Sequence, residues 1–217
     1  MRWLVSDYFV GLDLGKSADY SALAVVEVDE EYDQDTSRWR RRHAVRHLKR
    51  WTLRTPYPVI VTEVVGMLGK EPLEGARLVV DQTGVGAAVV DLLRTSGIEG
   101  LTPVLITAGN SVSRDGEGVY HVAKKELVST LQVLLQEHRL RIAPALQYAE
   151  TLEKELLTFR VKITAAANET FEAWRERDHD DLVLALALAV WHAEHQPLGE
   201  GAMPMVLSDR PALLRGF

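Results

Sequence analysis

The sequence contains no cysteine, which excludes disulfide bonds, thiolate metal ligands and cysteine nucleophiles within its 217 residues. It also lacks a long apolar run, since the longest one, Leu182 to Trp191, is too short to span a bilayer. The first residues, Met1 to Asp7, are too short and too charged for a signal peptide. These absences predict a soluble protein of the reducing cytoplasm with no membrane partner.

An excess of positive charge is missing as well. Lys and Arg number 25 against 31 Asp and Glu, so the formal net charge is −6, which disfavours binding to nucleic acid by bulk electrostatics. One local exception is the basic segment Arg38 to Arg50. It is compatible with a solvated strand or loop and with a patch that contacts phosphates, and both interpretations stay open. Its cations are Arg38, Arg40, Arg41, Arg42, Arg46, Lys49 and Arg50.

A hydrophobic fraction of 47% is enough for a folded core, and the length suits one large domain. We expect residues 1–195 to form this domain. The segment 196–217 is rich in proline and glycine, and we expect it to be a loosely ordered tail.

The apolar pattern changes along the chain. Three strand-like runs with short links predict an antiparallel meander, and helices then alternate with short buried strands. Between them we expect loops at Glu30–Ser37 and Gly109–Val119 and a hairpin at Thr158–Trp174. The expected strands are Tyr8–Leu14, Ser21–Asp29, Ala44–Leu53, Ala76–Val80, Leu101–Thr107 and Leu140–Ile142. The expected helices are Pro58–Leu68, Gly84–Ser96, Val122–Glu137, Ala145–Leu157 and Asp180–His195.

This order is that of a ribonuclease H-like α/β fold: a mixed sheet of three antiparallel strands followed by parallel strands, flanked by helices. Acids stand at its critical positions. Asp13 closes the first strand, Asp81 closes the neighbouring parallel strand, and Asp180 and Asp181 open the last helix. A carboxylate at the end of a buried strand costs free energy unless it is paired or binds a cation. We therefore expect the acids to meet in one cation cluster.

Each acid also has a simpler interpretation. Asp13 before Gly15 is compatible with a turn residue, and Asp81 with a turn or helix-cap acid. One of Asp180 and Asp181 is expected to be an N-cap or outer residue, with Asp181 favoured as the ligand. Beside them, His179 is more consistent with a surface residue than with a proton shuttle.

An all-aspartate site suits Mg²⁺ or Mn²⁺ better than Zn²⁺. Two such ions about 3.5–4 Å apart can activate a water and stabilise the leaving oxygen of a phosphodiester. We expect two ions, with Asp13 as the bridging ligand. The predicted catalytic residues are Asp13, Asp81 and Asp181, and the predicted metal ligands are Asp13, Asp81, Asp180 and Asp181.

Read together, these motifs resemble the nuclease domain of the large terminase subunit of tailed bacteriophages. The resemblance covers roughly Phe9 to His195. It is carried by Gly11-Leu-Asp-Leu-Gly-Lys-Ser-Ala-Asp-Tyr-Ser-Ala-Leu23, Val79-Val-Asp-Gln-Thr-Gly-Val-Gly86, Lys124-Lys-Glu-Leu-Val-Ser-Thr-Leu131, Leu140-Arg-Ile-Ala-Pro144 and His179-Asp-Asp-Leu-Val-Leu-Ala-Leu-Ala-Leu-Ala189.

The resemblance implies a metal-dependent endonuclease that cuts concatemeric viral DNA during genome packaging in the host cytoplasm. It implies double-stranded DNA as substrate, and a packaging ATPase, the small terminase subunit and the portal as partners. The Asp13, Asp81 and Asp180/Asp181 ligand set is carried over from it. The 217 residues contain no G-x-x-x-x-G-K-[ST] phosphate loop, so translocation is not assigned to them. We expect an excised nuclease domain or the product of a split gene.

Three alternatives remain. A Holliday-junction resolvase uses the same fold and acids. An actin-like ATPase or sugar kinase also ends its first strand in Gly-x-Asp-x-Gly, but it needs a second such domain. A nuclease-fold remnant could serve as a catalytically quiet docking module of a packaging motor.

Overall fold

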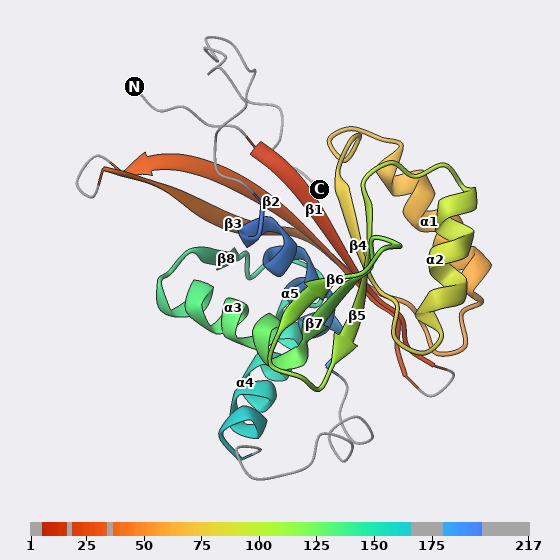
Figure 1. Ribbon diagram of the computed structural model, residues 1–217. Coiled ribbons are helices and arrows are strands. Elements are labelled where there is room, and N and C mark those ends of the chain that lie inside the picture. Colours follow the sequence, from red (N-terminus) through yellow and green to blue (C-terminus); the bar gives the residue numbers. More distant parts are fainter. Residues whose placement is uncertain (1–5, 17–18, 34–36, 166–179, 197–217) are drawn as a thin grey trace.

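A computed structural model describes residues 6–16, 19–33, 37–165 and 180–196. Its helices and strands follow one another in the order that the apolar pattern predicts, with two additional strands (Figure 1). In chain order they are β1 (Ser6–Asp13), β2 (Ala22–Asp33), β3 (Arg38–Arg50), α1 (Tyr57–Leu68), β4 (Arg77–Asp81), α2 (Gly86–Thr95), β5 (Leu101–Thr107), β6 (Val112–Arg114), β7 (Tyr120–Ala123), α3 (Lys124–Gln136), β8 (Leu140–Ile142), α4 (Ala149–Ala165) and α5 (Asp181–Glu194).

The strands form one sheet in the order β6-β7-β5-β4-β1-β2-β3-β8. β1, β2 and β3 make the antiparallel meander, whereas β4 pairs in parallel with β1 and β5 in parallel with β4. β1 therefore lies inside the sheet, between its parallel and its antiparallel part. This arrangement confirms the predicted fold class, a ribonuclease H-like mixed sheet flanked by helices.

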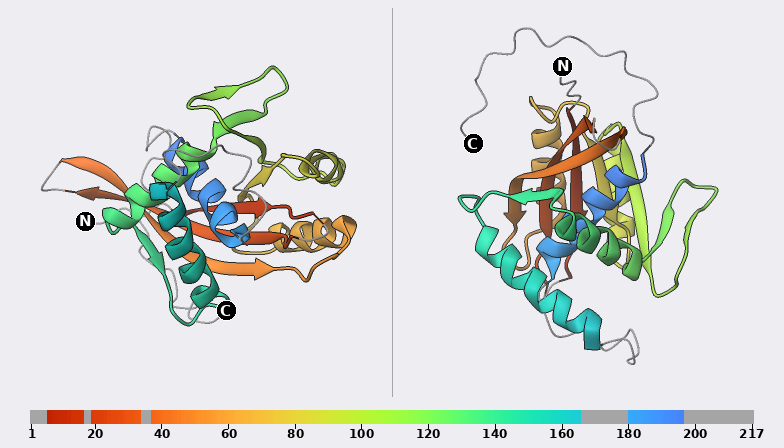
Figure 2. Two further views of the ribbon diagram at one scale, coloured as in Figure 1. Left: turned by 90° about the horizontal axis from the view of Figure 1, so that it is seen from below. Right: turned by 90° about the vertical axis from the view of Figure 1, so that its left-hand side faces the viewer.

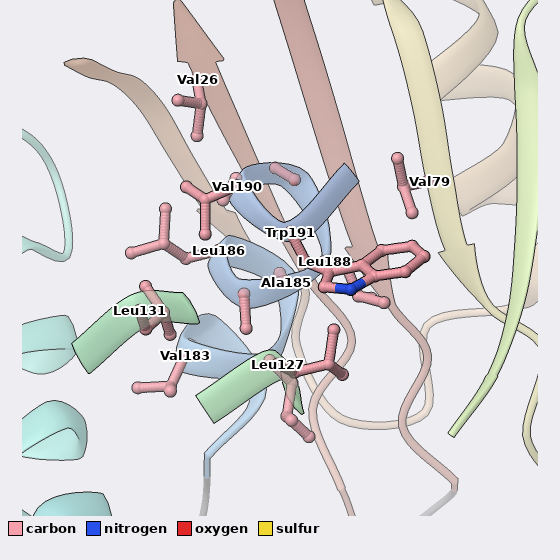
Figure 3. Packing of buried hydrophobic residues seen from close by; sticks show 14 of the residues in the cluster. Val26, Val79, Leu127, Leu131, Val183, Ala185, Leu186, Leu188, Val190 and Trp191 are labelled. Carbon is pink, nitrogen blue, oxygen red and sulfur yellow. The ribbon is translucent and has the colours of Figure 1, made fainter. Parts of the chain in front are cut away.

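Helices cover both faces of the sheet: α1 and α2 pack on one, and α3, α4 and α5 on the other (Figures 1 and 2). Side chains of β1 alternate between the two cores, with Phe9 on the α5 side and Val10 and Leu12 on the α1 side. α5 is buried on every side because it lies between the sheet and α3 (Figure 3). This explains why its sequence is apolar all round rather than amphipathic.

A glycine in β1 allows α5 to approach the sheet very closely. A Cβ atom built on Gly11 would lie 1.9 Å from the carbonyl oxygen of Ala185 and 3.0 Å from the backbone nitrogen of Ala189. Any larger residue at position 11 would therefore overlap the helix backbone. Gly11 sets the depth at which α5 sits, and with it the position of the first residue of the helix.

The predicted loop Glu30 to Ser37 is wrong in its first part, because β2 continues to Asp33. β3 likewise begins at Arg38, six residues before the predicted start, and ends at Arg50. These stretches have no apolar alternation and look like loops in the sequence. They pair because acids of β2 stand opposite arginines of β3, as in the pair Glu30 and Arg41, and opposite charges across an antiparallel pair stabilise it.

Two further predictions are corrected. The stretch Gly109–Val119 contains β6, and β7 takes the first residues of the helix predicted from Val122, so that α3 begins at Lys124. α4 begins at Ala149 and runs to Ala165, so the hairpin predicted at Thr158–Trp174 is wrong up to residue 165. The short apolar pattern after Thr158 is compatible with the spacing of a helix and with that of a strand. The residues continue as helix because the preceding turns of α4 are already helical.

Residues 166–174 of that hairpin, His179 and the predicted tail from residue 197 lie outside the described residues. Within the described ranges, none of the helices has both the length and the apolar character needed to cross a membrane.

Candidate functional site

The strand register places two of the predicted acids side by side. β1 and β4 run parallel, with Leu12 opposite Val80, so the next residues, Asp13 and Asp81, end neighbouring strands. Adjacent strands are about 4.8 Å apart. Both carboxylates point to the α5 face, because the residues before them belong to the α1 core. Asp13 and Asp81 are each only 8% exposed.

The residues opposite Asp13 in the antiparallel strands β2 and β3 also belong to the site. Asp13 lies opposite Ala22 of β2, and Ala22 lies opposite Arg50 of β3. Residues opposite each other share a face of the sheet, so Arg50 points to the same side as the acids. The methyl group of the fully buried Ala22 leaves room for the Arg50 side chain to extend towards them.

The N-terminus of α5 completes the cluster from above the sheet. Ala185, which touches Gly11, lies one helical turn after Asp181, and Gly11 lies two residues before Asp13. A turn of about four residues rises about 6 Å, and two residues of a strand span about 6.6 Å. The two acids therefore stand at the same level. Asp181 is 5% exposed, and Asp180 is the N-cap residue of the helix.

Electrostatics shows that the four acids are close enough to influence one another. Burial raises the pKa of Asp13 well above its ordinary value, and the negative charges of Asp81, Asp181 and Asp180 raise it further, whereas Lys124 lowers it. A carboxylate that is buried among like charges favours its neutral form unless a cation is added. The structure thus brings together all the acids that the sequence singled out, around Asp13.

Two cations of the chain already contact this cluster. Arg50 donates a hydrogen bond to Asp181 at 2.9 Å, and Lys124 donates one to Asp180 at 3.2 Å. The side chains of Arg50 and Lys124 are 13% and 8% exposed. Arg50 also lies over the ring of Tyr20 at 4.7 Å. In the sequence, Lys124 stood out only as the first residue of the motif that runs to Leu131. Arg50 was hidden among the other cations of the basic segment.

Glu155 of α4 is a third residue beside the acids, and sequence reasoning missed it. It binds Arg50, and its Oε2 accepts hydrogen bonds from the backbone N–H groups of Leu182 and Val183 at 3.1 and 3.2 Å. It therefore caps the N-terminus of α5 from another helix. Burial raises its pKa to about 7, although Arg50 and the two N–H groups lower it. A lone glutamate in an amphipathic helix gives no sequence signal for this role.

The simpler interpretations of the acids hold in part. Asp81 accepts a hydrogen bond from the backbone N–H of Thr83 at 2.8 Å, as a turn acid does. Asp180 occupies the N-cap position, but its side chain makes no capping hydrogen bond. Asp181 is the more buried of the adjacent pair. These positions agree with the predicted preference for Asp181 as the ligand, which stays a prediction.

Within the described residues, no three carboxylate or imidazole side chains are arranged to hold one metal ion. In this arrangement Asp181 turns to Arg50 and Asp180 to Lys124. Mg²⁺ commonly takes only one or two protein carboxylates and completes its shell with water or phosphate oxygens. The donor set is all carboxylate oxygen and is short of positive charge around Asp13, so its chemistry fits hard divalent cations.

The basic segment Arg38–Arg50 is mostly engaged with the protein itself. Arg41 is buried and donates to Glu30, to the carbonyl group of Ala193 in the last turn of α5 and to that of Gln196 just after the helix. Arg50 holds the first residue of the same helix. Other cations of the segment form ion pairs with acids, namely Arg42–Glu31, Arg46–Glu27 and Lys49–Glu63. The structure favours a role in fixing β2 and α5 over a phosphate-contacting patch.

Comparison with known proteins places the chain as follows. No family model matches it. The large terminase subunits of Thermus phage G20c and Thermus virus P23-45 are each 27% identical to it over 208 residues, a match that covers 96% of this chain and 36% of each relative. The chain thus spans about a third of their length. These matches confirm the resemblance to the large terminase subunit that the acidic motifs indicated.

Among solved structures, the human cytomegalovirus terminase nuclease domain aligns with a TM-score of 0.45 and 14% identity, covering 87% of this chain and 84% of that chain. A likeness of this size is too distant to bear on the chemistry of the site.

Proposed function

We propose that this chain, which is similar to large terminase subunits, is the part of such an enzyme that cuts DNA, a divalent-metal-dependent endonuclease. The observation that carries this proposal is the convergence of Asp13, Asp81, Asp180 and Asp181 at one end of the central strands, with the charge of Asp13 destabilised by its neighbours. If no cation were bound there, the folded state would be more stable with an uncharged residue in place of at least one of these acids.

Mg²⁺ or Mn²⁺ fits the donor set, and we propose two ions. Asp13 would contribute to both, because it lies between Asp81 on the neighbouring strand and Asp181 on the helix. Asp81 would hold one ion, and Asp181, with Asp180 beside it, the other. Bound there, the ions would supply an activated water and stabilise the charge on the leaving oxygen.

The other residues of the site orient the acids. Glu155 fixes the backbone at the start of α5, and Arg50 sets the orientation of the Asp181 carboxylate. Lys124 holds Asp180 and places a positive charge beside the acids, where a substrate phosphate would otherwise meet only negative charge. Each of these contacts is largely shielded from water, so its geometry is held firmly.

We propose double-stranded DNA as the substrate, cut with weak sequence preference during viral genome packaging. The packaging ATPase, the small terminase subunit and the portal are the proposed partners. Translocation is not proposed for these residues, since they contain no nucleotide-binding phosphate loop.

A plasmid-cleavage assay tests the proposal. With Mg²⁺ or Mn²⁺ the wild type should convert supercoiled plasmid to nicked and linear forms, and EDTA should stop the reaction. Asp13→Asn and Asp81→Asn should each lower cleavage at least 100-fold, because each removes a proposed ligand. Asp91→Asn is the matched control, since this acid of α2 is largely exposed, at 74%, and should leave cleavage unchanged.

Two results would overturn the assignment. Cleavage that persists in Asp13→Asn would place the chemistry elsewhere, and a folded wild type that cuts no DNA with either metal would support the docking module. A four-way junction run beside a linear duplex separates the remaining alternative, because a resolvase prefers the junction.

A further inference from the structure

The residues around the acids leave one physical requirement of DNA binding unmet. DNA must bring its phosphates to a cluster of four acids on a chain of net charge −6. The cations of the basic segment are largely paired with carboxylates of the chain, and Lys124 is tied to Asp180. Positive charge that is free to meet a phosphate must therefore come from other residues near the acids.

A pocket of about 280 Å³ lies at the same end of the sheet, on the α1 side of β1. It is formed where β1 ends, β2 begins and β3 leads into α1. Its lining includes Lys16 and Arg54, with the hydroxyl-bearing residues Ser21, Thr52 and Thr55. Its volume is slightly below that of small-molecule pockets, which run from about 300 to 1,000 Å³. A phosphate group with part of a nucleotide suits that size.

The two cations of the pocket are available to a ligand. Lys16 and Arg54 are both exposed. Within residues 6–16, 19–33, 37–165 and 180–196, neither forms an ion pair with a carboxylate, unlike the arginines of the basic segment. Lys16 leans towards the loop after Asp81, since its Cε is 3.5 Å from the position that a Cβ on Gly84 would take. It therefore extends from the end of β1 towards the loop that follows β4.

The walls of the pocket are held in place by hydrogen bonds. In the turn from Thr52 to Thr55, the carbonyl of Thr52 accepts from the N–H of Thr55 at 3.2 Å and from its hydroxyl at 2.7 Å. Across the pocket, the Tyr57 hydroxyl donates to the carbonyl of Gly15 at 2.9 Å. The strand ends and the turn are thus joined to each other, and the pocket is preorganised.

Arg54 sits in this turn with a φ of 66°. A non-glycine residue in the left-handed region carries backbone strain. Glycine would fill the position without that strain, yet the chain places a cationic side chain there, at the rim of the pocket. Such strain is expected where a side chain has a role outside folding.

We propose that this pocket holds a backbone phosphate of the bound DNA strand next to the scissile phosphate, with Lys16 and Arg54 as its cations. This inference rests on the proposed nuclease function and adds the site that positions the substrate. Asp19 also lines the pocket, so its formal charge is +2 from Lys16 and Arg54 and −1 from Asp19, or +1 in total. Asp19 therefore limits the affinity for the phosphate.

Binding of a labelled 30-base-pair duplex, titrated at several salt concentrations in an Asp13→Asn background with Mg²⁺, tests the proposal. Lys16→Ala/Arg54→Ala should weaken binding about tenfold or more and reduce the slope of log affinity against log salt by about 0.9, the contribution of the one phosphate that the pocket neutralises. Asp19→Asn should act in the opposite direction and tighten binding.

Two controls separate binding from folding and from net charge. Arg54→Gly removes the cation but relieves the backbone strain, so it should bind DNA less tightly while its melting temperature stays equal or rises. Lys70→Ala/Arg94→Ala removes the same charge from exposed positions away from the pocket and should leave the slope within half a unit of the parent.

An unchanged slope in Lys16→Ala/Arg54→Ala, or an equal loss in Lys70→Ala/Arg94→Ala, overturns the proposal. So does a rise in melting temperature with inorganic phosphate as large as the one with the duplex, which would indicate a site for free anions. Plasmid cleavage by the chain with Asp13 intact tests the nuclease function separately. Cleavage with an unaffected salt slope rejects the pocket alone, and loss of binding in a chain that never cleaves rejects the nuclease alone.

Discussion

Asp13 loses its hydration and gains negative neighbours when the chain folds, so its charge opposes folding until a cation arrives. Its pKa is raised first by burial and then by Asp81, Asp181 and Asp180. The two internal cations, Arg50 and Lys124, contact the acids of α5. They offset part of the repulsion without neutralising Asp13 itself.

Replacement of Asp13 by asparagine should therefore stabilise the protein in metal-free buffer at pH 7 by about 1–3 kcal/mol, since it removes the buried charge and keeps the shape. The pH dependence has a definite sign. A raised folded-state pKa gives stability that is present below the unfolded value of about 3.9 and is lost as the pH rises through the folded value. Wild-type stability should fall with pH in this range, and Asp13→Asn should flatten the fall. Thermal melts from pH 4 to 8 in EDTA measure it.

Mg²⁺ should reverse the order of stability of the wild type and Asp13→Asn, because it binds the folded state of the wild type and stabilises it by mass action. At one hundred times its dissociation constant a ligand stabilises a protein by about 2.7 kcal/mol, and this gain should be present in the wild type and largely missing in Asp13→Asn. Asp91→Asn, an exposed acid, serves as the control. Equal metal-induced shifts in wild type and Asp13→Asn would contradict the ligand assignment.

At the scale of elements, the contact between β1 and α5 decides whether the acids meet. The helix carries Asp181 at one end, and the close approach at Gly11 sets how deep it lies. The two ends of α5 are then held from β3, by Arg50 at the N-terminus and by Arg41 at the C-terminal carbonyls. A cation at the last carbonyls also complements the helix dipole.

Gly11→Ala should destabilise the protein by about 1–3 kcal/mol or more, because its Cβ would overlap backbone atoms that a rotamer change cannot move. Cleavage should fall with it, since α5 must shift away from Asp13. Gly66→Ala is the matched control: Gly66 lies on the exposed side of α1 with nothing within 4 Å of an added Cβ. It should stabilise by about 0.5–1 kcal/mol. Urea denaturation of both variants measures the difference, and similar effects would show that the close approach is not needed.

At the scale of the whole molecule, the charges of the described part are arranged mainly for its own fold. Arginines of β3 face glutamates of β2 across the strand pair, and the basic segment ties together the sheet and α5. A high density of arginine in the sequence is thus compatible with little free positive charge on the surface. The proposed binding of DNA then depends on a few cations near the acids, Lys16 and Arg54 among them.

Replacing Arg42 and Arg46, which are exposed and paired with acids, should therefore leave the salt slope of DNA binding unchanged and alter stability by less than about 0.5 kcal/mol each. Arg41→Ala should instead lower stability by roughly 2–4 kcal/mol, because Glu30 and the last carbonyls of α5 would lose a buried partner. DNA titrations and urea melts check both expectations. A flatter slope in Arg42→Ala/Arg46→Ala would restore the phosphate-contacting patch.

The sequence by itself determined the order along the chain of most helices and strands, the buried parallel strands β4 and β5, and the acids at the ends of β1 and β4. These features depend on the local spacing of apolar residues and on the residues next to them. It also identified α5, whose apolar run needs no partner to be recognised. It misjudged the lengths of β2 and β3, where the stabilising feature is a charge ladder between strands. It also misjudged α4, where a short alternation fits both periods.

Only the tertiary structure decided which residues surround the acids. Arg50 and Asp181 are 131 positions apart, and Arg50 and Glu155 are 105 apart, so no local pattern links them. Their meeting follows from the register of β3 and from the depth of α5 against Gly11. The same register brought the turn with Arg54 beside the end of β1. Local sequence specifies which side chains stand at the ends of strands, whereas packing specifies which of them share a site.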